Sequence, residues 1–196
     1  LLGVVGQDEA GDAIVRLLDA SAIRHYLQRD AATSTIVKLR VIGRQQQLLR
    51  IDFEQAPADD ALRNKLARFD ALLSEYDIVV LSDYAKGGLV DVAAMIHLAR
   101  QAGKTVLVDP KGEDFSRYAG ASILTPNKAE FRAIVGSWSS EDELTAKAQQ
   151  LRAALQLDAL LLTRSEEGMT LYSEQGVAHA PTMAREVYDV SGAGDT

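Results

Sequence analysis

Residues 77–108 read DIVVLSDYAKGGLVDVAAMIHLARQAGKTVLV, in which two short apolar runs are separated by a longer amphipathic segment. The first run is Asp77–Leu81 and the second is Thr105–Val108. The segment between them predicts a helix over about Leu89–Ala102, which Gly103 ends. Short, continuously apolar runs joined by helices are typical of parallel strands in an α/β protein. This stretch therefore predicts a strand–helix–strand unit.

The same alternation continues toward the C-terminus and predicts one extended sheet. In chain order, it predicts a strand at Ser122–Thr125, a helix at Asn127–Val135, a helix capped by Ser140 and Glu143, a strand at Asp158–Thr163, and a hairpin from Met169–Tyr172 and Gly176–His179. We therefore expect an α/β fold whose mostly parallel sheet has helices on both faces.

The N-terminal part of the chain shows a different pattern. Glu9–Ala20 has apolar residues at helical spacing, and Leu62–Leu73 indicates a second helix. Between them, Thr35–Arg40 and Leu48–Glu54 are rich in β-branched or alternating residues and predict an antiparallel pair. We expect this pair to form a small lid or edge element, over about residues 33–55, outside the main sheet.

Composition excludes several classes of protein. With 196 residues, the chain fits one domain, and no apolar run approaches the roughly 18 residues that a membrane-spanning helix needs. The net charge of −7 lacks the excess of positive charge that is typical of nucleic-acid-binding proteins, so neither nucleic acid nor membrane is an expected partner. The absence of cysteine excludes disulfides and thiolate nucleophiles, and it agrees with a cytoplasmic location.

Polar residues follow most of the predicted strands, where α/β sheets bind their ligands. These loops are Ser82–Gly87, Asp109–Gly112, Thr125–Glu130, Thr163–Gly168 and Asp189–Asp195. No P-loop, dinucleotide-binding glycine motif, nucleophile elbow or zincin helix occurs in the sequence. The corresponding ATPases, dehydrogenases, hydrolases and metalloproteases are therefore disfavoured.

Among these loops, the run Gly192-Ala193-Gly194-Asp195 gives the most specific indication of function. Small residues let successive backbone N–H groups approach an anion, and a helix opening there adds the positive end of its dipole. A carboxylate beside such a site can take a proton from an attacking hydroxyl. The alternative is an ordinary glycine-rich turn with a solvated aspartate.

The pair Asn127 and Glu130 allows two interpretations that are compatible with each other. Asparagine followed three residues later by glutamate is a capping box. The same side chains at a helix start could face a cluster of phosphate and Mg²⁺, which prefers oxygen ligands.

Two predicted strand ends each place a carboxylate near a lysine. Asp83 with Lys86, and Asp109 with Lys111, could bind sugar hydroxyls and a phosphate, or could form ordinary loop ion pairs. On the lid, Arg44 could attract an anionic substrate or could be simply solvated.

Together these motifs resemble the ribokinase/PfkB family of carbohydrate kinases. Asp189–Thr196 is similar to the second signature of that family, and Asn127–Glu130 matches its N-x-x-E motif. Within the family, the likeness is greatest to kinases of heptose 7-phosphate. The stretches that support it are Lys38–Glu54, Leu81–Gly87, Asp109–Phe115, Leu124–Phe131 and Thr163–Val190.

The resemblance implies a role for each candidate residue. Asp195 would be the catalytic base, and the N–H groups of Gly192, Ala193 and Gly194 would form the anion hole. Asn127 and Glu130 would organise the ATP phosphates and Mg²⁺, Glu130 through water. The residues expected to border the nucleotide are Thr163, Ser165 and Gly168, and those expected near the sugar phosphate are Asp83, Lys86, Asp109, Lys111 and Arg44.

The resemblance also implies a ribokinase-like fold and a reaction. The expected reaction is transfer of the γ-phosphate of ATP to the anomeric hydroxyl of D-glycero-β-D-manno-heptose 7-phosphate, which gives the 1,7-bisphosphate used for lipopolysaccharide. A kinase of fructose 1-phosphate or tagatose 6-phosphate, and an inert fragment, are the alternatives.

Residues 1–196 would be one PfkB-type domain truncated at both ends, inactive by itself. We further expect an adenylyltransferase module in the longer parent and a homodimer formed through the lid.

Overall fold

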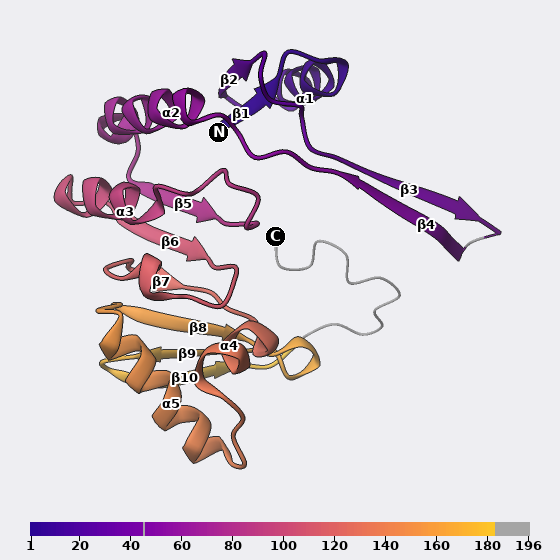
Figure 1. Ribbon diagram of the computed structural model, residues 1–196. Coiled ribbons are helices and arrows are strands. Elements are labelled where there is room, and N and C mark those ends of the chain that lie inside the picture. Colours follow the sequence, from indigo (N-terminus) through magenta and orange to yellow (C-terminus); the bar gives the residue numbers. More distant parts are fainter. Residues whose placement is uncertain (45, 183–196) are drawn as a thin grey trace.

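The computed structural model describes residues 1–44 and 46–182 as a six-stranded sheet, a smaller N-terminal layer and a projecting hairpin (Figure 1). The sheet has the strand order β10-β9-β8-β7-β6-β5. Strands β5 to β8 run parallel, and β9 and β10 are antiparallel. The strands are β5 (Ile78–Ser82), β6 (Thr105–Asp109), β7 (Ile123–Leu124), β8 (Ala159–Thr163), β9 (Met169–Ser173) and β10 (Gly176–Ala180). The predicted α/β fold, with its mostly parallel sheet, is confirmed.

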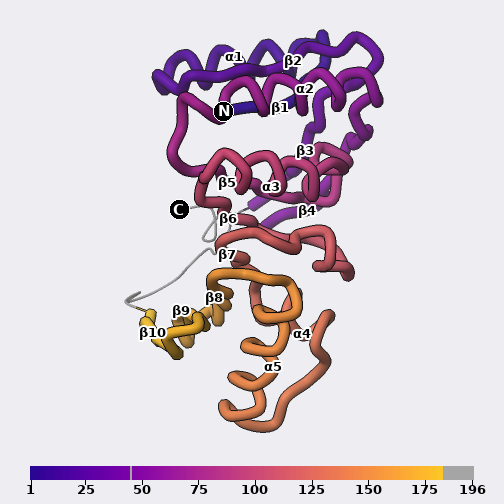
Figure 2. The backbone as a smooth tube through the Cα atoms, turned by 90° about the vertical axis from the view of Figure 1, so that its left-hand side faces the viewer, coloured from indigo at the N-terminus to yellow at the C-terminus, as the bar shows by residue number. Residues whose placement is uncertain are grey.

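Three helices follow or join these strands. They are α3 (Val92–Gln101), α4 (Lys128–Val135) and α5 (Glu141–Ala154), with short 3₁₀ turns at η1 (Leu73–Glu75), η2 (Ser116–Tyr118) and η3 (Ser165–Glu167). Within the described residues these three helices lie on one face of the sheet (Figure 2), whereas we expected helices on both faces. On the opposite face, Ile78 and Val80 of β5 are 58% and 67% exposed.

One apolar core lies between the sheet and those helices. Alternate residues of several strands point into it, such as Val106 and Val108 of β6, which are fully buried. Two aromatic side chains from the connecting segments, Phe115 and Tyr118, pack edge to face with ring centroids 5.8 Å apart. These two rings therefore anchor the segment after β6 in the core.

The N-terminal layer contains two strands that the sequence analysis did not predict. β1 (Leu2–Gly6) and β2 (Tyr26–Asp30) form a parallel pair, with α1 (Glu9–Ala20) between them in the chain and α2 (Asp59–Leu72) packed against both. The predicted helix over residues 9–20 is confirmed, and α2 begins three residues before the predicted Leu62.

The predicted antiparallel pair is a hairpin of β3 (Val37–Gly43) and β4 (Gln46–Phe53). It forms its own two-stranded sheet and extends away from the rest of the molecule beyond the carboxyl ends of the parallel strands (Figure 1). Among the described residues, no helix has both the length and the apolarity to cross a bilayer.

Candidate functional site

The candidate site lies along the carboxyl ends of β5, β6, β7 and β8. Because these four strands are parallel, the loops that follow them emerge at the same edge of the sheet, which is the edge from which the hairpin projects (Figure 1). Four of the five polar loops expected from the sequence are therefore brought together. The fifth, with Gly192, Ala193, Gly194 and Asp195, lies outside the described residues.

Asn127 and Glu130 form the predicted capping box at the start of α4. The Asn127 side chain accepts a hydrogen bond from the Glu130 N–H at 2.9 Å, and Glu130 Oε2 accepts one from the Asn127 N–H at 3.0 Å. This reciprocal pair orders the first turn of the helix at the sheet edge. The positive end of a helix is thus presented to the site, where it favours a negatively charged group.

Lys111 extends from the loop after β6 and reaches the same capping box. Its ammonium lies 2.6 Å from Glu130 Oε1, and this contact, assisted by the charge of Asp109, raises the pKa of Lys111. The lysine side chain is half exposed, whereas that of Glu130 is 13% exposed. The two residues form an ion pair with its cation facing outward, which the sequence could not indicate because they lie 19 positions apart.

Asp83, in the loop after β5, is buried. The residue is only 4% exposed, and its carboxylate accepts hydrogen bonds from the Ala85 N–H and the Tyr118 hydroxyl, both at 2.8 Å. Arg117 lies 3.8 Å from the same carboxylate. The buried Asp83 carboxylate therefore stabilises the loop after β5 and connects it to Tyr118.

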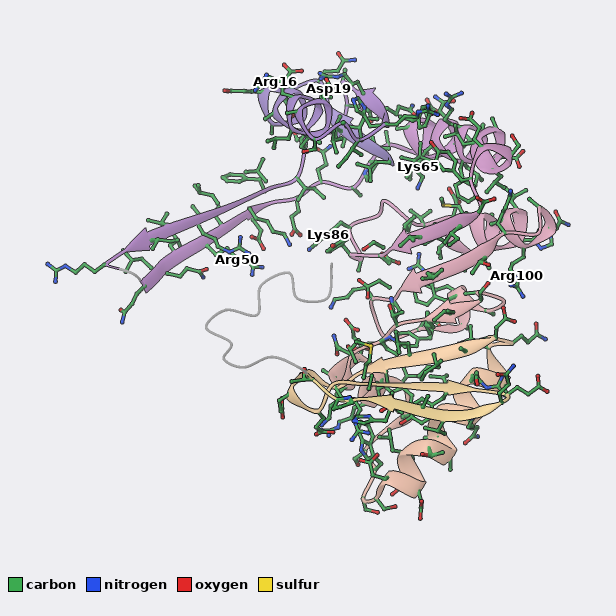
Figure 3. The ribbon with its side chains drawn as sticks, turned by 180° about the vertical axis from the view of Figure 1, so that it is seen from behind. Arg16, Asp19, Arg50, Lys65, Lys86 and Arg100 are labelled. Atoms are coloured by element: carbon green, nitrogen blue, oxygen red, sulfur yellow. The ribbon has the colours of Figure 1, made fainter. Side chains whose placement is uncertain are left out.

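The other residues expected near a sugar phosphate divide into two groups. Lys86 lies at the sheet edge, where it forms an ion pair with Glu54 at the base of the hairpin, and Figure 3 shows it on the side facing that hairpin. Asp109 ends β6, and its carbonyl accepts a hydrogen bond from the Asp83 N–H at 3.0 Å. Arg44 instead lies exposed in the turn of the hairpin, away from the strand ends.

The loop after β8 forms a tight turn beside Asn127. Thr163 pairs with Asn127 as an isolated parallel bridge, and its N–H donates to the Pro126 carbonyl at 3.0 Å. Ser165 has a left-handed φ of 54°, and its carbonyl accepts a hydrogen bond from the Gly168 N–H at 3.0 Å. A Cβ at Gly168 would lie 2.8 Å from Pro181 Cα, so only glycine fits this turn.

Arg164 is a residue of this loop that the sequence analysis missed. It is 9% exposed, and its guanidinium binds the carboxylates of Glu141, at 2.7 Å, and Glu167. The hydrogen bond from Arg164 lowers the pKa of Glu141, and hydrogen bonds from Lys128 and then Arg164 lower the pKa of Glu167. The cluster joins the loop to α5, and no spacing in the sequence predicted the contact with Glu141.

The oxygen ligands at this edge suit a magnesium ion held mainly by nucleotide phosphates. No group of three or more metal-ligating side chains occurs within residues 1–44 and 46–182. Both carboxylate oxygens of Glu130 already accept hydrogen bonds, so water-mediated contact to Mg²⁺ fits better than direct ligation.

Comparison with known proteins points to one protein family. Residues 1–196 match the family model described as "pfkB family carbohydrate kinase". The chain is 54% identical over 196 residues to D-beta-D-heptose 7-phosphate kinase of Bordetella bronchiseptica, covering all of this chain and 63% of that protein. It is 52% identical to bifunctional protein HldE of Halorhodospira halophila. That match covers all of this chain and 41% of that protein. The chain thus spans about two fifths to two thirds of the length of these relatives.

Solved structures support the fold. Ribokinase from Giardia lamblia has a TM-score of 0.78 and 18% identity, over 98% of this chain and 62% of that one. Phosphofructokinase-2 from Escherichia coli has the same TM-score and identity, and the match covers 98% of this chain and 64% of that one. The ribokinase-like fold is therefore confirmed, and because the family model matches every residue, the chain belongs to the pfkB family of carbohydrate kinases.

Proposed function

We propose that the whole protein containing residues 1–196 is an ATP-dependent kinase of D-glycero-β-D-manno-heptose 7-phosphate. The observation that supports this substrate best is the 54% identity to a heptose 7-phosphate kinase along the complete chain. The gathering of Asn127, Glu130, Lys86 and Lys111 at one sheet edge supports the chemistry, because it combines a helix N-terminus with two cations near an expected phosphate site.

In this proposal, Asp195 takes the proton of the anomeric hydroxyl. The hydroxyl oxygen then bonds to the γ-phosphorus of ATP as the bond to the leaving ADP oxygen breaks, which gives the 1,7-bisphosphate. The N–H groups of Gly192, Ala193 and Gly194 would bind the transferring phosphoryl group. We base these four roles on the sequence motif.

The described residues would bind and orient the reactants. Asn127 and the water-linked Glu130 would orient the phosphates, and Mg²⁺, when bound, would neutralise their charge. The turn of Thr163, Ser165 and Gly168 would border the nucleotide. The residues proposed to lie near the 7-phosphate and sugar are Lys86, Lys111, Asp109 and, through the loop that it holds, Asp83. Arg44 would reach the substrate only if the hairpin closed as a lid.

Coupled ADP release with a panel of phosphosugars tests the proposal. We expect the whole protein to turn over heptose 7-phosphate with a kcat/KM at least 10²-fold above that for fructose 1-phosphate and tagatose 6-phosphate, because recognition of several polar groups permits discrimination of this order. Preference for either of the other sugars would favour the alternative substrate class. An absence of sugar-dependent turnover would favour an inert protein.

We also propose that the hairpin mediates a homodimer. Its strand pairing places six apolar side chains on one face, all between 37% and 55% exposed: Val37, Leu39, Val41, Leu49, Ile51 and Phe53. A contiguous apolar face of this kind is typical of an interface, and a second copy would cover it with the same face.

Light scattering of the purified whole protein would measure its mass. Leu49→Lys should yield a monomer, whereas Leu48→Lys, at an exposed position next to it, should remain a dimer. A monomeric wild type at micromolar concentration would contradict the dimer.

One relative is named a bifunctional protein and is more than twice as long as this chain. On the sequence resemblance, we propose that the whole protein carries an adenylyltransferase module and acts in the cytoplasm.

A further inference from the structure

The Tyr118 hydroxyl connects the two loops that carry Lys86 and Lys111. Tyr118 is fully buried in η2, and its hydroxyl oxygen lies 2.8 Å from Asp83 Oδ2 in the loop after β5. The same oxygen lies 2.9 Å from the Lys111 carbonyl and accepts a hydrogen bond from the Lys111 N–H at 3.1 Å. One phenol thus contacts the backbone of one loop and the buried carboxylate of the other.

The loop after β5 depends on side chains outside it for its shape. Ala85 has a left-handed φ of 54°, which is unfavourable for a residue with a Cβ. Arg117 donates to the Leu89 carbonyl at 2.6 Å, and the buried Lys65 donates to the Gly88 carbonyl. Figure 3 shows Lys65 on α2, above this loop. Local strain of this kind persists only where surrounding contacts determine it.

We propose that Tyr118 is a positioning residue for phosphosugar binding, because its hydroxyl sets the separation of the Lys86 and Lys111 loops through Asp83. This inference rests on the proposed function, in which the two lysines bind the sugar phosphate. Tyr118 itself is fully buried, so it would act through the two loops and not by direct contact with the reactants. Burial raises its pKa to about 12, so the hydroxyl stays protonated and able to donate throughout the neutral range.

Tyr118→Phe separates the hydroxyl from the packing of the ring. The ring meets Phe115 edge to face at 5.8 Å, and phenylalanine retains that contact. Tyr172→Phe is the matched control, because Tyr172 is also fully buried and its hydroxyl contacts Thr145 and Thr170, on the α5 side of the core.

Steady-state kinetics of the whole protein provide the test. We expect Tyr118→Phe to raise the KM for heptose 7-phosphate by about 10-fold, since misplacement of binding groups by a fraction of an ångström has effects of this order. The KM for ATP should stay within twofold of wild type, and Tyr172→Phe should change neither constant. Equal KM values for the phosphosugar in Tyr118→Phe and Tyr172→Phe would overturn the inference while leaving the proposed function intact.

Two further measurements guard against a purely structural effect. Hydrogen exchange at the Lys111 amide should accelerate in Tyr118→Phe and remain slow in Tyr172→Phe. Unchanged exchange in Tyr118→Phe would contradict the hydrogen bond between the Lys111 N–H and the Tyr118 hydroxyl. Asp83→Ala should raise the same KM, and the double variant should be no worse than the larger single effect, because both changes remove the contact between Tyr118 and Asp83. Additive effects of the two substitutions on KM would contradict the inference that both residues act through one contact. An inactive wild type would overturn the proposed function together with this inference.

Discussion

Replacing Asn127 in two ways separates its capping role from its proposed role at the nucleotide phosphates. The side-chain oxygen accepts the Glu130 N–H at 2.9 Å, so Asn127→Ala removes one half of the capping box. Loss of such a cap costs about 1 kcal/mol, within a range of about 0.5–2 kcal/mol. For a chain of this size that loss lowers the Tm by roughly 2–4 °C.

Asn127→Asp keeps the acceptor and adds a charge at the positive end of α4. Aspartate caps as well as asparagine, so the Tm should stay within about 2 °C of wild type. A carboxylate beside ATP phosphates would, however, repel them. Two unit charges about 4 Å apart interact by roughly 4 kcal/mol near a protein surface, and even a quarter of that lowers kcat/KM for ATP about fivefold.

Thermal unfolding of residues 1–196 and coupled ADP release by the whole protein measure the two effects. The expected pattern is a less stable Asn127→Ala and a stable Asn127→Asp whose kcat/KM for ATP falls at least fivefold. If Asn127→Asp retained wild-type kcat/KM, Asn127 would serve only as a helix cap, and its proposed role at the phosphates would be refuted.

Three other substitutions test separate parts of the account. Asp195→Asn in the whole protein should bind ATP and sugar but turn over at least about 10²-fold more slowly, and near-normal turnover in a coupled assay would exclude Asp195 as the base. Phe131→Ala should cost about 3–5 kcal/mol in urea unfolding, because the ring is fully buried and packs 5.7 Å from Trp138; a loss below about 1 kcal/mol would contradict that packing. Burial lowers the pKa of Lys65, so the unfolded chain binds more protons than the folded one between that lowered pKa and 10.5. The stability of wild type relative to Lys65→Met should therefore rise with pH through this window in urea melts at pH 7 and pH 10, and a constant difference would show that the ammonium is not desolvated.

The sequence predicted most of the sheet because its strands are short apolar runs with helices between them. It failed at β1, where two glycines occupy five positions, and at β2, whose residues YLQRD are mostly polar. Both strands form through their pairing with each other, which local propensity does not reveal.

The candidate site was predicted as a set of loops, whereas the contacts within it were not. Topology brings the loops to one edge, and that followed from the parallel strands. The burial of Asp83 depends on Tyr118, 35 positions later, and the ion pair of Lys111 depends on Glu130. Such contacts between distant residues arise only when the core has packed.

The position of the new phosphate tests the central claim most directly. Phosphorus NMR of the product formed by the whole protein from ATP and heptose 7-phosphate would show which hydroxyl has reacted. The account predicts one new phosphate ester coupled to the anomeric proton, with one ADP released for each ester formed. A phosphate at any other carbon, or ADP formed without a new sugar phosphate, would contradict it.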